Sequence, residues 1–101
     1  MLETKLRKQY RAIGHHLKPV VMIADKGVSE AVVKEINRAL DDHELIKINI
    51  KIGDRAAMRE VIDDLCQQLN AELVQTIGKM ALLLRPNPKA KPQLSNLTRA
   101  H

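Results

Sequence analysis

The stretch KPVVMIADKGVSE, residues 18–30, runs from an apolar strand through a short turn into the start of a helix. Residues 20–23 form an apolar run typical of a strand, and Ser29 is a favoured helix N-cap residue. The turn between them, residues 24–27, ends in glycine and carries one lysine. The first four amides of a helix have no partner within it, and the helix dipole adds about half a positive charge there. The stretch therefore predicts a strand-turn-helix unit that suits a phosphate group.

Helix and strand patterns continue on both sides of this stretch. Upstream, apolar residues recur at helical spacing until Pro19, which disfavours helix at the residue before it and starts the strand. Downstream, isoleucines alternate with polar residues over residues 45–52, as in a strand with one buried face. The expected elements are helices over residues 4–15, 29–42 and 55–70 and strands over residues 20–23, 45–52, 72–77 and 80–85.

This order of elements, αβαβαββ, predicts an α/β fold. Strands joined by helical crossovers pair in parallel, whereas the two-residue link Gly78-Lys79 is typical of an antiparallel hairpin. We therefore expect a single compact domain with a mixed four-stranded sheet packed with helices, which suits a chain of 101 residues. The domain should span residues 1–86. Residues 87–101 hold two prolines and few apolar positions, so we expect a flexible basic tail there.

The composition indicates an aliphatic core and excludes several classes of protein. Tyr10 stands alone among Phe, Trp and Tyr, so the chain lacks the exposed rings on which base-stacking modules such as the RNA recognition motif depend. Cys66 is the single cysteine, which excludes an internal disulfide and a cysteine zinc cluster and fits a reducing compartment. The longest apolar runs have five residues, too short for a signal-peptide core or a membrane span. We expect a cytoplasmic protein.

The net charge of +5 is unevenly distributed. Residues 1–19 carry five basic residues and one acidic residue, and residues 79–101 carry five basic residues and no acidic residue. The middle of the chain, residues 20–78, holds seven basic and eleven acidic residues. Two cationic ends around an acidic middle suggest a polyanionic partner, with nucleic acid the commonest candidate and an acidic membrane surface the next.

Several short motifs follow one another across residues 4–86. They are Leu17-Lys18-Pro19-Val20-Val21, Gly27 before the second helix, His43-Glu44-Leu45-Ile46-Lys47, Gln75-Thr76-Ile77-Gly78-Lys79 and Leu84-Arg85-Pro86. In this order they resemble the CRM domain family (chloroplast RNA splicing and ribosome maturation), in its small stand-alone bacterial YhbY form. None of the motifs is specific alone, but together they are.

The resemblance implies a compact RNA-binding domain similar in fold to the C-terminal domain of translation initiation factor three. It further implies that the partners are ribosomal RNA or precursors of the large ribosomal subunit, with no membrane and no small-molecule substrate. We expect a monomer without a cofactor. In the family the loop before the second helix reads Gly-x-x-Gly, whereas this chain has Ala24 at the first glycine. If that position requires a positive φ, alanine costs about 1 kcal/mol or more.

The residues expected to bind RNA are those of the loop and the basic residues around it, with Lys26 as the main phosphate contact. The alternative reading of the loop is an ordinary strand-to-helix turn, and that of the basic helix is a solvated face. The full set is Ala24, Asp25, Lys26, Gly27, Lys5, Lys8, Arg11, Lys18, Lys47, Lys79 and Arg85.

No catalytic or metal site is predicted. The adjacent His15 and His16 point about 100° apart on a helix and cannot chelate one ion together. Cys66 borders an apolar helix stripe, where it reads as a small core residue. We therefore expect a non-catalytic RNA-binding protein that acts in assembly of the large ribosomal subunit. The alternative is an adaptor whose acidic second and third helices bind another protein and which has no direct role with RNA.

Overall fold

The computed structural model describes residues 4–24 and 27–97 of the chain. Within these ranges, helices and strands follow one another in the predicted order, αβαβαββ. Ser29 and Asp54 cap the second and third helices, because their side-chain oxygens accept hydrogen bonds from Val32 N and Ala57 N. The elements are α1 (Thr4–His15), β1 (Pro19–Ile23), α2 (Glu30–His43), β2 (Leu45–Ile50), α3 (Arg55–Leu69), β3 (Glu72–Ile77) and β4 (Met80–Leu84).

The strands form one mixed sheet in the order β1-β2-β4-β3. β1 pairs with β2 in parallel, and β4 pairs antiparallel with both β2 and β3. The parallel pair follows from the α2 crossover. The β3–β4 pair follows from the short turn at Gly78, whose φ of +56° glycine readily adopts. The predicted α/β fold with a mixed four-stranded sheet is confirmed.

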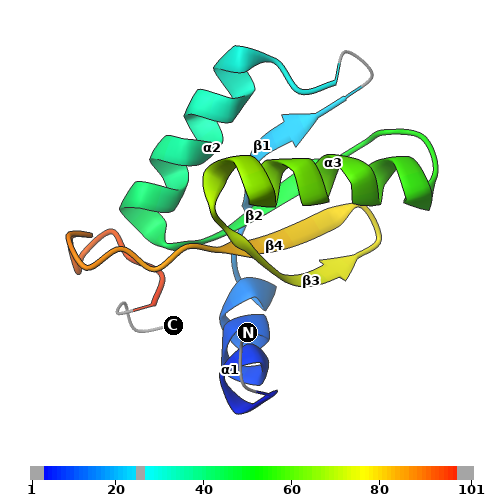
Figure 1. Cartoon of the computed structure of the whole chain (residues 1–101). Coiled ribbons are helices and arrows are strands. Elements are labelled where there is room, and N and C mark those ends of the chain that lie inside the picture. Colours follow the sequence, from blue (N-terminus) through cyan, green and yellow to red (C-terminus); the bar gives the residue numbers. More distant parts are fainter. Residues whose placement is uncertain (1–3, 25–26, 98–101) are drawn as a thin grey trace.

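Helices cover both faces of the sheet. α2 and α3 pack against one face and α1 against the opposite face (Figure 1). The larger core lies under α2 and α3, because the isoleucines of β2 alternate toward that side and meet Ile36 and Leu40 of α2. The smaller core lies under α1 and consists of Tyr10, Ile13, Leu17, Leu45, Val74, Leu82, Leu84 and Leu97.

α1 packs closely on the sheet because Gly14 faces Leu82. A Cβ atom on Gly14 would lie 2.5 Å from Leu82 Cδ2, closer than real Cβ contacts come. Arg7 Nη1 also donates hydrogen bonds to the carbonyl oxygens of Leu73 (3.2 Å) and Val74 (2.7 Å) on β3. These contacts hold the helix in one position on the sheet.

Glu44 lies at the junction of α2 and β2 and is buried. Its φ is +62°, an unusual conformation for a residue with a side chain, and its N–H donates to Leu40 O at the end of α2. Its carboxylate accepts hydrogen bonds from Asn87 N (2.6 Å) and from the hydroxyl of the buried Ser95. The segment after β4 therefore folds back over this junction.

Residues 87–97 are packed on the domain, which differs from the flexible tail predicted from the sequence. Asn96 N donates to the carbonyl oxygen of His43 (2.9 Å), and Leu97 packs into the smaller core. The anchors are mainly polar side chains and backbone groups, so no apolar periodicity marked them in the sequence. The rest of the predicted tail, residues 98–101, lies outside the described part of the chain.

Candidate nucleic-acid interface

The loop between β1 and α2 carries the turn that the sequence singled out. Gly27 has a φ of +75°, which favours glycine, and its N–H donates to Ala24 O (2.8 Å) across the turn. Ala24 is exposed and does not have a positive φ, so alanine fits at this position without backbone strain. Asp25 and Lys26 lie outside the described residues, and their roles stay predictions.

Carboxylates flank the start of α2. Ser29 satisfies one amide of the helix by accepting a hydrogen bond from Val32 N (3.1 Å). The cleft between the start of α2 and α3 is lined by Glu30 and Asp64 among other residues. Their charges repel a phosphate that approaches between the two helices.

Two lysines lie at the end of the sheet where β1 and β2 end. Lys51 N donates to Ile23 O (2.7 Å), which keeps the residue after β2 beside the end of β1. Lys79, in the turn between β3 and β4, accepts a hydrogen bond from Ile50 N at its carbonyl oxygen (2.7 Å). Both lysines are exposed. We call Lys51, Lys79, Ala24 and Gly27 the basic edge; it lies at the carboxyl ends of parallel strands, where ligands of open α/β sheets bind.

A second group of cations lies on α1 and at the start of β1. Lys5, Lys8 and Arg11 are exposed on α1, Lys18 is exposed directly before β1, and Lys47 is half-buried on β2 beside the start of β1. We call these five residues the α1-side cations.

Arg85 is engaged inside the protein, in contrast to the phosphate contact predicted for it. Its side chain is 17% exposed and donates to Asn37 Oδ1 (2.8 Å), Asn37 O (2.8 Å) and Leu69 O (2.9 Å). It also forms an ion pair with Asp41 at 2.8 Å. Arg85 thus ties α2 and α3 to the end of β4, and we remove it from the candidate interface.

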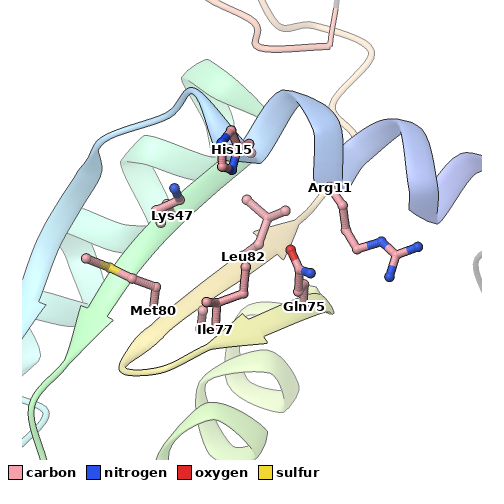
Figure 2. Close-up of a pocket in the computed structure, with 9 residues that line it drawn as sticks. Arg11, His15, Lys47, Gln75, Ile77, Met80 and Leu82 are labelled. Atoms are coloured by element: carbon pink, nitrogen blue, oxygen red, sulfur yellow. The ribbon is translucent and has the colours of Figure 1, made fainter.

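A groove between α1 and the sheet was not predicted from the sequence. It has a volume of about 260 Å³, and no carboxylate is among the described residues that line it. Figure 2 shows Arg11 and His15 on the helix above Lys47 on β2 and the strands of the hairpin. The apolar floor of the groove is formed by Ile77, Met80 and Leu82. A glycine within the first helical pattern was the sequence signal for such close packing.

The thiol of Cys66 is not activated. The residue is half-buried, and burial, with a smaller effect of the Asp63 carboxylate, raises the pKa of the thiol to about 11. Because the thiolate is the nucleophilic form, this shift disfavours reaction of the thiol at neutral pH. In the described ranges no three metal-ligating side chains come together, and none of the helices is long and apolar enough to cross a membrane.

The fold and these surfaces define a class of protein. A small α/β domain with cations gathered at one sheet edge and around one helix has the features of a domain that binds nucleic acid through the phosphate backbone. The chain belongs to the CRS1/YhbY (CRM) domain family, which its sequence matches over residues 2–85. The resemblance drawn from the short motifs is therefore confirmed.

Bacterial relatives are named for RNA binding. The chain is 49% identical over 98 residues to a probable RNA-binding protein of Pseudomonas aeruginosa, an alignment that covers 97% of this chain and 94% of the relative. It is 41% identical over 93 residues to an RNA-binding protein of Haemophilus influenzae, an alignment that covers 92% of this chain and 94% of that relative. The solution structure of a hypothetical protein from Staphylococcus aureus has the same fold, with a TM-score of 0.77 and 30% identity over 90% of this chain and 95% of that one.

Proposed function

We propose that the protein binds ribosomal RNA in precursors of the large ribosomal subunit and assists their assembly without catalysing a reaction. One observation carries the proposal: cations lie along α1, at the start of β1 and where β1 and β2 end, in a chain whose relatives are named for RNA binding. The motif resemblance supports the large-subunit precursor as the particle. The protein would act in the cytoplasm as a monomer.

The basic edge and the α1-side cations would each hold a stretch of phosphate backbone. Exposed ammonium groups gain affinity for RNA because each phosphate contact releases condensed counterions. Lys26, next to the turn at Gly27, would add its charge to the basic edge. Tyr10 packs into the smaller core, so bases do not stack on it. Affinity would therefore come mainly from the phosphate backbone and its spacing.

A matched pair of charge reversals tests the position of the site. Lys26→Glu and Lys34→Glu change the net charge equally, but Lys34 is exposed on the flank of α2, apart from both cationic groups. We expect Lys26→Glu to weaken binding of a large-subunit RNA fragment about tenfold and to lower the log–log salt slope by about 0.7. Lys34→Glu should have a much smaller effect. Equal losses for the two variants would show that the loop is not the site.

Sedimentation of the tagged protein with cell extracts tests the role in assembly. We expect the protein to travel with particles that contain precursor large-subunit RNA, and to leave them at high salt because the contacts are electrostatic. Recovery only in the fractions without ribosomal particles, or with mature ribosomes alone, would contradict the proposed role in assembly. RNA binding itself would then be judged from the affinities and salt slopes of the charge-reversal variants.

A further inference from the structure

Between the basic edge and the α1-side cations, the sheet exposes apolar side chains that α1 does not cover. Val20 and Met22 on β1 are 39% and 56% exposed, and Ile77 on β3 is 61% exposed. Single exposed apolar residues are common on proteins, but a group of them on one sheet face between two cationic groups marks an interaction surface.

Cross-strand pairing arranges these side chains in one row. Met22 pairs with Asn49, Asn49 with Met80, and Met80 with Ile77, so the row crosses all four strands of the sheet. At one end the row enters the groove under α1, whose floor includes Ile77 and Met80 (Figure 2). Methionine is flexible and adapts its shape to the molecule that it contacts. The row and the groove therefore form one continuous apolar surface.

Asn49 lies in the middle of this row, and its buried side-chain oxygen, Oδ1, is left without a partner among the described residues. An unpartnered buried acceptor destabilises a protein, and an aliphatic side chain at this position would avoid that cost. Because its neighbours in the row are Met22 and Met80, a ligand that displaces these flexible side chains would give the amide a partner.

The charges of the groove restrict what can occupy it. Arg11, His15 and Lys47 line it, and none of its described lining residues is acidic, so the occupant carries negative charge. The volume of about 260 Å³ lies just under the range of roughly 300–1,000 Å³ typical of small-molecule sites. It is therefore too small for a helix of a partner protein. A flat apolar group with a hydrogen-bonding edge and an adjoining anion fits, and a nucleotide combines all three.

We propose that this surface holds one unstacked nucleotide of single-stranded RNA, with its base against Ile77 and Met80 and its phosphates on Arg11 and Lys47. The inference rests on the proposed RNA-binding function and adds a contact that depends on the base. A strand that runs between the two cationic groups crosses the row, and splayed bases are available in single-stranded RNA but not in a helix. The protein therefore prefers unpaired RNA at this position.

The test compares a short single-stranded RNA with an abasic oligomer of the same length and charge, using the full-length protein. The wild type should bind the base-bearing RNA about fivefold or more tightly, from the apolar area that a base buries. The double variant Ile77→Ala/Met80→Ala should lose this preference and keep the salt slope. Val28→Ala is the matched control: Val28 is a 38% exposed apolar residue that does not line the groove, and the variant should keep the preference.

Each alternative outcome overturns the inference. Equal affinity of the wild type for the two oligomers, with a normal salt slope, refutes the base site and leaves the proposed function standing. A preference that survives in the double variant, with circular dichroism showing a folded protein, places base recognition elsewhere. If the wild type binds neither oligomer at low salt, the proposed function falls together with this inference. If the double variant no longer binds a protein partner of the wild type but binds RNA unchanged, the groove is the site of that protein.

Discussion

Replacing Arg85 with alanine should cost the protein stability and leave its RNA affinity nearly unchanged. The side chain bridges α2 and α3 through contacts of 2.8 to 2.9 Å with three residues. One acceptor, Leu69 O, belongs to the last residue of α3, where carbonyl groups lack partners within the helix. The guanidinium also places positive charge near the C-terminal end of that helix, which the helix dipole favours.

These contacts set the size of the expected loss. The ion pair with Asp41 contributes less than about 1 kcal/mol, because the Asp41 side chain is 57% exposed and screened by solvent. The hydrogen bonds to Asn37 and Leu69 contribute about 0.5–1.5 kcal/mol each. The free energy of unfolding should therefore fall by about 2–4 kcal/mol, which corresponds to a decrease of roughly 10–25 °C in Tm for a domain of this size.

Urea unfolding followed by far-UV circular dichroism measures the loss, and RNA affinity is measured at a temperature where the variant is folded. Lys89→Ala is the control, because Lys89 is an exposed cation of the same C-terminal region; its effect should stay below about 0.5 kcal/mol. Arg85→Lys should recover less than half of the loss, since an ammonium group lacks the fork that reaches both helices. An Arg85→Ala protein with unchanged stability but RNA affinity weakened about tenfold would refute the reasoning and return Arg85 to the interface.

Two further measurements test other parts of the structure. Truncation after Pro86 should lower the free energy of unfolding by about 2–3 kcal/mol, because the buried Glu44 loses the hydrogen bonds from Asn87 and Ser95; an unchanged urea midpoint would show that the segment does not stabilise the domain. Alkylation of Cys66 should accelerate about tenfold per pH unit up to near pH 11, because only the thiolate reacts and burial raises the pKa of the thiol to about 11. A rate that levels off near pH 9 would mean that the thiol is solvated.

The sequence was sufficient for the fold because several local signals agree. Alternating isoleucines predicted β2, Pro19 marked the start of β1, and Ser29 and Asp54 capped the helices at the predicted places. The end of β2 was predicted two residues too late, at Ile52, because the alternation continues after strand pairing has stopped. Periodicity shows which face of the sheet a side chain occupies, but it does not show where the backbone stops pairing with the neighbouring strand.

The candidate site was less predictable because its geometry depends on distant residues. Arg85 looked like one more cation of a basic C-terminal region, yet its acceptors lie 16, 44 and 48 positions earlier in the chain. The groove likewise combines α1 with strands from the other end of the sequence. The alternation of its strand placed Lys47 on the polar face, and the structure adds that α1 borders this face.

The central place of β4 in the sheet determines how the chain can fold during its synthesis. β4 follows all the other strands in the sequence, yet it lies between β2 and β3 (Figure 1). A nascent chain without β4 can form the β1–β2 pair, but β2 then presents an open edge and β3 has no neighbour in the sheet. Pairing of β2 with β4 joins residues that are distant in the sequence, from Asn49 with Met80 to Leu45 with Leu84. Such non-local pairing slows folding. Until that strand emerges from the ribosome, the unpaired edge is open to aggregation.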